Sequence, residues 1–345
     1  MWGAPSFPAV RRKERVRWES GNTVLPGGAS AGKIGTIWPP GGSWEGEEMA
    51  VFPDIGKLAE RAERLTARLS QCDICPRLCR VNRQAGELGV CRVGADAAVS
   101  SFGPHFGEEA PLVGIHGSGT VFFSGCNLRC VFCQNYEISH LGEGSEVSAE
   151  RLAGIFLSIQ RMGCHNLNLV TPTHMTPQIL TALSLAVPRG LSIPVVYNCG
   201  GYESVETLRE LEGVVAIYMP DVKFLGAKQS DRYGNAPDYP EVVRAALREM
   251  DRQVGPLVLD RRGNARRGLL VRHLVMPGEA STTRQVIDFL ADEIGQETYL
   301  NLMNQYRPCG RALEFPEIGR RTAHAEWEEA RNYAREKGMS RLDER

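Results

Sequence analysis

An alternation of short apolar runs and amphipathic segments occupies most of the chain from residue 119 onward. The apolar runs are rich in β-branched residues and lie near 119–124, 166–171, 193–198, 214–219, 268–275 and 298–303. The segments with helical periodicity lie near 148–160, 176–187, 204–211, 239–253, 282–294 and 322–337. Six consecutive βα units predict an α/β fold with a parallel sheet. A doubly wound sheet and an incomplete TIM-like barrel both satisfy this pattern, and both place the working site at the carboxyl ends of the strands.

Composition argues against several classes of protein. The 40 Lys plus Arg residues balance 41 Asp plus Glu residues, for a net charge of −1. This balance argues against a globally electropositive nucleic-acid binder, so we expect no DNA partner. No run approaches the roughly 20 apolar residues of a membrane span, and we expect no membrane association. The basic cluster at residues 11–17 is followed by no apolar core of a secretory signal, so the predicted location is cytoplasmic.

The N-terminal part of the chain differs from the rest. Residues 1–48 contain five Pro and nine Gly and show no helical or strand period, which predicts a disordered lead over residues 1–50. Whether residues 1–48 belong to the native protein stays open, because Met49 opens an ordinary helical lead-in. We therefore expect a disordered segment at 1–50, a helix with a four-cysteine metal-binding segment at 51–112, and the barrel at 113–338.

Three of the ten cysteines form a CxxxCxxC motif directly after the first predicted strand. Cys126, Cys130 and Cys133 lie in one short loop. Three thiolates from one loop can hold three irons of a 4Fe–4S cluster and leave the fourth iron open. An open iron can bind the amino and carboxylate groups of S-adenosylmethionine. A disulfide would leave one thiol over, and a structural zinc ion would need a fourth ligand.

The segment around this motif, GCNLRCVFCQNYEIS at residues 125–139, resembles radical S-adenosylmethionine (radical SAM) proteins related to pyruvate formate-lyase activating enzyme. The resemblance covers about residues 70–320. Other segments that fit this subfamily are CDICPRLC at 72–79 with Cys91, TPTH at 171–174, YNCGGY at 197–202, PDVK at 220–223, RHLVMPG at 272–278 and NLMNQY at 301–306.

The resemblance implies a fold, a chemistry and a set of cofactors. The fold is a partial (βα)6 TIM-like barrel, and the cofactors are a 4Fe–4S cluster and S-adenosylmethionine. The implied reaction is reductive cleavage of S-adenosylmethionine to a 5′-deoxyadenosyl radical that abstracts hydrogen from a substrate. Residues 171–173 (TPT) depart from the Gly-Gly-Glu type of segment that often receives the methionine amine in this superfamily.

Four further cysteines lie upstream with the spacing Cx2Cx3Cx11C: Cys72, Cys75, Cys79 and Cys91. Four closely spaced thiols suggest a second metal site. A second iron–sulfur cluster that relays electrons, a structural zinc ion, and reduced or disulfide-forming thiols are the three interpretations. Gly86 and Gly89 lie between the third and fourth cysteines and let the chain fold back.

Polar residues follow the remaining strands, where a bound cofactor or substrate would lie. Asn198, followed by two glycines, and Asp221 are the predicted cofactor-binding residues. The alternative for Asn198 is a Gly-rich turn that this residue caps. Lys223 is either a ligand contact or a solvated lysine. His174 and His273 could orient a substrate, although a structural histidine is the simpler interpretation of each.

The implied enzyme is an oxidoreductase of the radical SAM type with an unidentified substrate. No protein acid or base is needed in the first step, so no catalytic side chain is predicted. One candidate reaction is activation of a glycyl-radical enzyme, which makes a protein the substrate; radical modification of a small molecule, peptide or RNA is the alternative. The expected partner is an electron donor such as flavodoxin or ferredoxin. A non-enzymatic alternative is an iron–sulfur electron carrier or structural metal protein.

Overall fold

The six predicted parallel strands all form and lie side by side in the computed structural model, which describes residues 52–343. The predicted disordered lead at residues 1–50 lies outside the described residues. Within residues 52–343 the sheet has nine strands: β1 (Ala97–His105), β2 (Ser118–Phe123), β3 (Ser145–Val147), β4 (Leu167–Val170), β5 (Val195–Cys199), β6 (Ile217–Pro220), β7 (Val258–Leu259), β8 (Ala265–Leu274) and β9 (Tyr299–Met303).

The order of the strands confirms the α/β partial barrel. Strands β2, β4, β5, β6, β8 and β9 follow one another in parallel. These are the six strands that the sequence predicts. Three strands were not predicted, and all three are antiparallel: β1 pairs with β2, β3 pairs with β1, and β7 pairs with β8. Because β1 joins the sheet, the cysteine-rich segment that precedes it is continuous with the barrel.

The helices follow the predicted alternation. In the described part of the chain they are α1 (Ile55–Ala67), α2 (Ala110–Val113), α3 (Tyr136–Ser139), α4 (Ala149–Arg161), α5 (Thr176–Ala186), α6 (Val205–Glu210), α7 (Ala227–Gly234), α8 (Tyr239–Val254), α9 (Thr283–Phe289) and α10 (His324–Glu336). The predicted helix at 282–294 is α9 followed by a π-helical turn. Ser148 caps α4, and its hydroxyl accepts from the N–H of Arg151 at 3.3 Å.

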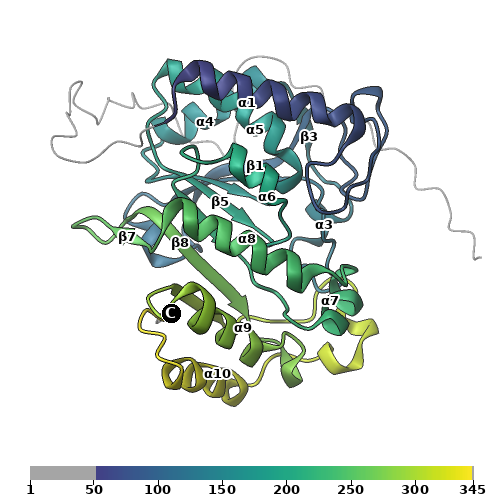
Figure 1. Cartoon of the computed structure of the whole chain (residues 1–345), viewed down its shortest axis with the longest axis vertical. Helices are drawn as coiled ribbons and strands as arrows, with labels where there is room; N and C mark the ends of the chain where they lie inside the picture. The colour runs from purple at the N-terminus through teal and green to yellow at the C-terminus, as the bar shows by residue number, and fades with distance from the viewer. Residues whose placement is uncertain (1–51, 344–345) are drawn as a thin grey trace, which may run out of the picture. The chain divides into compact units, whose positions relative to one another are not determined.

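Burial explains why these elements pack as they do. Every residue of β4, β5 and β6 is buried, as expected for parallel strands that are covered on both faces. Figure 1 shows helices around the outside of the strands, with α1 and α5 at one end of the molecule and α9 and α10 at the other. Helices α1 and α4 both pack on α5. The amphipathic helix that Leu58, Ala62 and Leu65 predict is α1, and all three side chains are buried.

The last barrel strand, β9, is covered at its edge by the C-terminal segment. Leu342 forms a parallel bridge with Leu300, and the Tyr299 hydroxyl donates to Asp343 at 3.0 Å. The Trp327 indole N–H of α10 donates to the Leu302 carbonyl at 2.6 Å. These contacts satisfy an edge strand that would otherwise present unpaired backbone groups.

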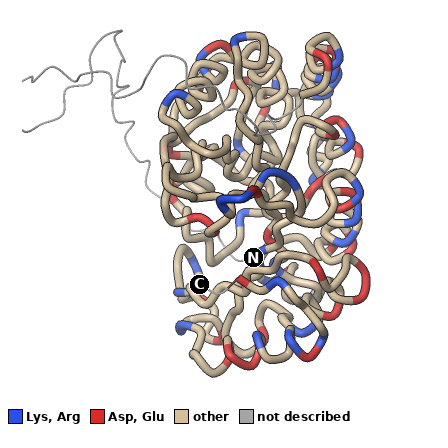
Figure 2. Tube along the Cα trace, turned by 90° about the vertical axis from the view of Figure 1, so that its left-hand side faces the viewer, with Lys and Arg blue, Asp and Glu red and all other residues tan. Residues whose placement is uncertain are grey.

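Charged residues show no separation by sign. Figure 2 shows acidic and basic positions interspersed on the visible face. The basic run at residues 261–267 forms the turn between β7 and β8 and the start of β8, and Arg261 and Arg262 are exposed there. This turn precedes β8, so it lies at the end of the barrel opposite the carboxyl ends of the strands. The absence of a DNA partner stays a prediction. Among the described residues no helix is both long and apolar enough to cross a membrane.

A close contact between β2 and α4 yields a test of the packing. A Cβ atom at Gly119 would collide with the Ile159 side chain and lie 2.6 Å from the Asn166 carbonyl oxygen. We expect Gly119→Ala to lower the free energy of unfolding by about 1–3 kcal/mol, because the backbone oxygen cannot move away cheaply.

The matched control is Gly154→Ala on α4, where a Cβ atom meets nothing within 4 Å. This variant should raise the free energy of unfolding by roughly 0.5–1 kcal/mol, because alanine is the better helix former. Denaturant unfolding of both variants measures the difference. Equal stabilities of the two variants would contradict the described packing of α4 on β2.

Candidate functional site

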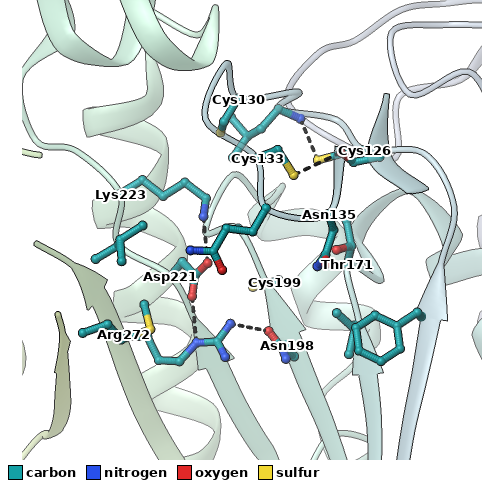
Figure 3. Close-up of a pocket in the computed structure, with 18 of the residues that line it drawn as sticks. Cys126, Cys130, Cys133, Asn135, Thr171, Asn198, Cys199, Asp221, Lys223 and Arg272 are labelled. Atoms are coloured by element: carbon teal, nitrogen blue, oxygen red, sulfur yellow. Dashed lines mark hydrogen bonds and ion pairs between the residues drawn. The ribbon is translucent and has the colours of Figure 1, made fainter. Parts of the chain in front are cut away.

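A cavity of about 490 Å³ lies at the carboxyl ends of the parallel strands. Every parallel strand, or the loop after it, contributes to its lining. All five residues that the sequence assigns to the 4Fe–4S cluster and to S-adenosylmethionine line this cavity: Cys126, Cys130, Cys133, Asn198 and Asp221. Figure 3 shows the cysteines on one wall of the cavity and Asn198 and Asp221 across from them. The structure thus brings together residues nearly 100 positions apart, although their roles stay predictions.

The loop that carries the three cysteines leaves β2 through a glycine that no other residue can replace without strain. Gly125 has a φ of 80°, and a Cβ atom there would collide with the carbonyl oxygen of Cys91. Further along the loop, the N–H of Leu128 donates to the Cys126 sulfur at 3.4 Å. The Ser139 hydroxyl donates to the Cys133 sulfur at 3.1 Å. Hydrogen-bond donors at sulfur favour the thiolate form that metal ligation requires.

The three thiols fit a metal cluster by their chemistry. Burial raises the pKa of Cys130 to about 12, and the nearby Lys223 ammonium opposes this effect without cancelling it. Burial also raises the pKa of Cys133, against the hydrogen bond from Ser139. A buried thiol of this kind gives up its proton to a metal rather than to solvent. The loop supplies three thiols beside an open cavity, which suits a cluster with one iron left for an exchangeable ligand.

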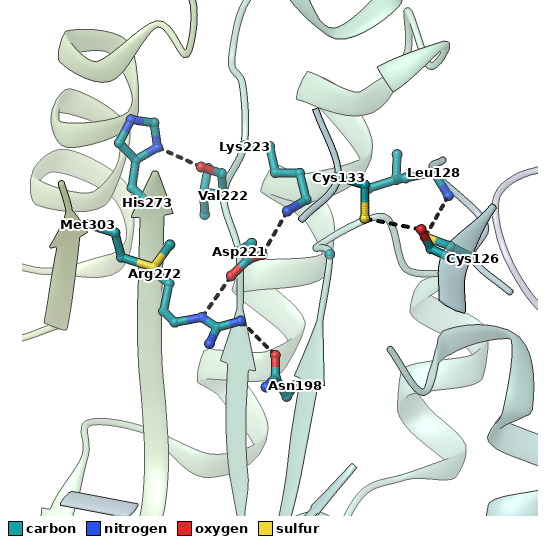
Figure 4. A network of polar contacts seen from close by, with 12 residues as sticks. Cys126, Leu128, Cys133, Asn198, Asp221, Val222, Lys223, Arg272, His273 and Met303 are labelled. Carbon is teal, nitrogen blue, oxygen red and sulfur yellow. Dashed lines mark hydrogen bonds and ion pairs between the residues drawn. The ribbon is translucent and has the colours of Figure 1, made fainter. Parts of the chain in front are cut away.

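A network of buried charges forms the opposite wall. Asp221 lies between two cations: the Arg272 Nε donates to its Oδ1 at 2.8 Å, and the Lys223 Nζ donates to its Oδ2 at 2.7 Å. The Nη2 of the same guanidinium donates to Asn198 Oδ1 at 2.7 Å. Figure 4 shows this chain of contacts running from β8 to the ends of β5 and β6. Residues two apart on an extended segment share a face, which is why Asp221 and Lys223 reach one cavity.

The charges of this network stabilise one another. Burial by itself raises the pKa of Asp221, but Arg272 and Lys223 outweigh it and lower that pKa to about 2. Burial likewise lowers the pKa of Lys223, and Asp221 outweighs it and raises that pKa. The Asp221 carboxylate is therefore ionised at every physiological pH. The side chain of Lys223 is 19% exposed and paired, so the alternative of a solvated lysine is wrong.

Sequence reasoning missed several polar residues of this cavity, among them Arg272, Glu108, Glu109 and Asn301. Arg272 lies near the carboxyl end of β8, and an arginine directly after the apolar run at residues 269–271 was the available signal. Glu108 and Glu109 follow β1, which was not predicted as a strand, and Asn301 lies on β9. The Arg272 Nη1 is 3.8 Å from Glu108 and 3.7 Å from Glu109. Asn301 donates to Glu109 at 3.0 Å, while one oxygen of each glutamate has no hydrogen-bond partner.

The two histidines have structural roles. His273 is fully buried, with Nδ1 2.7 Å from the Val222 carbonyl oxygen and Nε2 3.0 Å from the Thr283 hydroxyl. His174 is buried against the Ser124 carbonyl oxygen, at 2.8 Å from its Nε2. Burial lowers the pKa of each to about 4, so both rings are neutral near pH 7. Neither histidine lines the large cavity.

The upstream cysteines come together at a second place. Cys72, Cys75, Cys79 and Cys91 border a cavity of about 10 Å³, next to His174. All ten cysteines of the chain are free thiols in the described structure. Among the described residues, no three or more His, Cys, Asp or Glu side chains are arranged as ligands of one metal ion. The same holds for Cys126, Cys130 and Cys133, which line the large cavity.

A buried carboxyl group in the loop after β5 makes the stability of the fold depend on pH. Glu203 is 3% exposed and accepts hydrogen bonds from the Thr173 hydroxyl at 2.6 Å and the Tyr197 hydroxyl at 3.1 Å. Burial outweighs these bonds and raises the pKa of Glu203 to about 7. Because the folded pKa is above the unfolded one, the stability contribution is present below about pH 4.5 and is lost as the pH rises through about 7.

We therefore expect Glu203→Gln to remove part of the loss of stability between pH 5 and pH 8. A rise in pKa from 4.5 to about 7 corresponds to roughly 3 kcal/mol. Denaturant unfolding of the wild-type and variant chains across this range measures the effect. Glu336→Gln, at an exposed position of α10, is the control and should leave the pH dependence unchanged. Parallel pH profiles of wild type and Glu203→Gln would refute the assignment.

Comparison with known proteins places the chain in a family. The family described as "Radical SAM superfamily" matches residues 120–260, which include the cysteine loop, Asn198 and Asp221. The chain is 33% identical over 268 residues to "Uncharacterized protein MJ0674" of Methanocaldococcus jannaschii, across 75% of this chain and 72% of that protein. It is 25% identical over 303 residues to "Uncharacterized protein MJ0808" of the same organism, across 80% of this chain and 81% of that protein.

These relatives do not single out the pyruvate formate-lyase activating type. The superfamily itself is shown by the match to the family and by the extent of the similarity to the first relative. Membership implies an enzyme with a 4Fe–4S cluster and S-adenosylmethionine as cofactors. The chain belongs to the radical SAM superfamily.

Proposed function

We propose that this chain uses a cluster on Cys126, Cys130 and Cys133 to generate a radical that abstracts hydrogen from a polar substrate in the 490 Å³ cavity. The observation that carries this proposal is the convergence of the three thiols and the Asp221 network on one cavity. When bound, the cluster and S-adenosylmethionine supply reductive cleavage of the S–C5′ bond and the 5′-deoxyadenosyl radical. A low-potential protein such as flavodoxin or ferredoxin supplies the electron in this proposal.

The protein's own part is to hold and orient the cofactor. Asn198 is oriented by Arg272, because a guanidinium only donates and so must contact the amide oxygen. The Asn198 amide N–H groups are left to donate to a hydroxyl or carboxylate of the ligand. Asp221 is ionised and can accept from a ligand hydroxyl with its remaining lone pairs. These two residues are the proposed contacts to S-adenosylmethionine, and their fixed geometry lowers the entropy cost of binding.

The far wall of the cavity supports a substrate that carries hydrogen-bond donors or a positive charge. Glu108 and Glu109 line the cavity and are almost fully buried. The Oε2 atom of each accepts no hydrogen bond, while Glu108 Oε1 is 3.0 Å from His105 Nδ1 and Glu108 Oε2 is 3.8 Å from Arg272 Nη1. Leaving a buried acceptor unsatisfied costs about 1–3 kcal/mol, which a donor group on a substrate would recover. A small molecule or a peptide side chain can provide such a group.

Activation of a glycyl-radical enzyme is the second candidate. The segment of Asp221 and Lys223 is similar to an Asp-x-Lys segment near the cofactor in activating enzymes, and the structure places both residues on the cavity. In that case the substrate is a backbone Cα–H group of another protein. A glycine backbone offers no charged group to Glu108 and Glu109, which is why we place this candidate second.

The core of the proposal predicts a cleavage assay. Anaerobically reconstituted chain with dithionite and S-adenosylmethionine should form 5′-deoxyadenosine and methionine. Cys130→Ala should abolish this formation, because the cluster loses one of three thiolate ligands. Cys309→Ala, at a half-buried cysteine outside the cavity, is the control and should retain it. If the wild-type chain carries its cluster by spectroscopy but forms no 5′-deoxyadenosine, the enzyme assignment fails.

A labelling experiment separates the two substrate classes. Cells are grown in deuterated medium, and their extract is fractionated and added to the reduced enzyme. We expect deuterium to be transferred from the extract to 5′-deoxyadenosine. The active fraction should pass a filter that retains proteins. Electron paramagnetic resonance of the retained protein fraction tests the second candidate through its glycyl radical doublet. Activity confined to the protein fraction, with that doublet, would contradict a small-molecule substrate.

A further inference from the structure

The upstream cysteine segment is held together by little regular structure. Between α1 and β1 the described chain forms only two short 3-10 helices, η1 (Arg68–Gln71) and η2 (Arg83–Ala85). Even so, Cys72, Cys75 and Cys91 are buried and Cys79 is half-buried. Gly89 passes so close to Cys79 that a Cβ atom there would lie 2.8 Å from the sulfur. A segment with so little regular secondary structure would gain stability from a bound metal ion, and the four thiols that border one small cavity suit such an ion.

The buried side chain of Arg83 borders the 10 Å³ cavity between the upstream cysteines, and not all of its N–H groups are hydrogen-bonded. Arg83 is 1% exposed; its Nε donates to Gly94 O and its Nη1 to His174 O, each at 2.9 Å. The Nη1 is also 4.0 Å from the Cys72 sulfur. The Nη2 of Arg83 and the Nδ1 of His174 have no hydrogen-bond partner. A buried guanidinium whose partners are carbonyl groups and a thiol requires negative charge nearby, and four thiolates on a divalent ion carry a net charge of −2.

A backbone N–H group donates to a cysteine sulfur in the upstream segment, as in the cluster loop. In the upstream segment, the backbone N–H of Val90 donates to the Cys79 sulfur at 3.5 Å. In the cluster loop, the backbone N–H of Leu128 donates to the Cys126 sulfur at 3.4 Å. One cysteine of each group thus accepts a hydrogen bond from the backbone, which favours its thiolate form.

We propose that Cys72, Cys75, Cys79 and Cys91 bind one Zn²⁺ ion as four thiolates. The cavity between them, at about 10 Å³, has room for about one water-sized sphere, which suits a single ion. A 4Fe–4S cluster adds eight atoms and has ample room only beside the other cysteine loop, in the 490 Å³ cavity. This assignment selects zinc among the three interpretations that the cysteine spacing leaves open. Binding draws the four sulfurs onto the ion and releases their protons.

The ion would position the catalytic loop through Arg77, which lies between Cys75 and Cys79. The Arg77 Nε donates to the carbonyl oxygen of Asn127 at 2.7 Å, inside the cluster loop. Its Nη2 donates to Gly234 O at 3.2 Å, at the end of α7. One guanidinium thus ties the cluster loop to the barrel, and a short turn closed by the metal fixes where that guanidinium lies. Arg77 is a positioning residue, since it acts on the loop and not on substrate.

Metal analysis of the full chain tests the site without reference to activity. After anaerobic purification and iron–sulfur reconstitution, we expect about one zinc and about four irons per chain. About eight irons without zinc would overturn the assignment, and so would four irons with four upstream thiols free to react with an alkylating reagent. Because neither result depends on S-adenosylmethionine cleavage, failure of this proposal is distinct from failure of the proposed function.

Variants test the link to the cluster loop. Cys75→Ser and Cys91→Ser should lose zinc and form 5′-deoxyadenosine about 10-fold more slowly, as is typical when support of a metal site is removed. Cys164→Ala, at a buried cysteine before β4, is the matched control and should keep zinc and rate. Arg77→Ala should keep zinc, lower the rate, and change the electron paramagnetic resonance spectrum of the reduced cluster with S-adenosylmethionine. Arg77→Lys should restore little, because lysine lacks the forked donors. An unchanged spectrum in Arg77→Ala would overturn the positioning role.

Discussion

The buried contact between Asp221 and Arg272 is the interaction on which the candidate site depends. Asp221 follows β6 and Arg272 lies on the neighbouring strand β8, so their 2.8 Å contact ties these two strands together beside the cavity. The same guanidinium orients Asn198 at the end of β5. Removal of one partner from a buried ion pair typically costs 3–5 kcal/mol, because the other charge stays in a medium of low dielectric. A charged wall at the centre of a barrel is therefore held by mutual neutralisation.

The cluster loop depends on a second set of contacts, from the chain that precedes the barrel. Arg77 donates a hydrogen bond to the carbonyl oxygen of Asn127 in the loop. The carbonyl oxygen of Cys91 lies against Gly125, where the loop begins. Arg83 reaches the same region through His174, whose ring contacts Ser124. The upstream cysteine segment thus contacts the cluster loop, and the same loop lines the cavity. A loop with no strand or helix of its own obtains a fixed position in this way.

The elements that could be predicted are those with a clear period. The six parallel strands and one main helix after each were predicted to within a few residues, because buried parallel strands are apolar runs. The helices α3 and α7, which also lie between these strands, were missed. Strand β1 was missed because it contains Gly103 and Pro104, which predict a turn, yet it pairs antiparallel with β2. Strand β3 has three residues, two of them exposed, and carries no apolar signal. These strands form because the strand beside them has unpaired backbone groups at its edge: β1 pairs with β2, and β3 pairs with β1.

The candidate site divides along similar lines. Cys126, Cys130 and Cys133 could be predicted because one short loop carries all three, so spacing along the chain stands for spacing in space. Glu108 and Glu109 could not, because they reach the cavity through a strand that was not predicted. The choice between zinc and a second cluster also lay beyond spacing, since Cx2Cx3Cx11C is compatible with both. The size of the cavity between the sulfurs favours a single ion.

The sequence by itself determined the α/β alternation, the end of the sheet at which a site forms, and the three-cysteine motif. Each of these follows from local pattern: periodicity selects strand or helix, and parallel strands place their carboxyl ends together. Only the tertiary structure decided that Arg272 holds both Asp221 and Asn198, and that Arg83 is buried beside four thiols. The physical reason is that burial and charge pairing depend on which distant segments meet, and no local pattern carries that information.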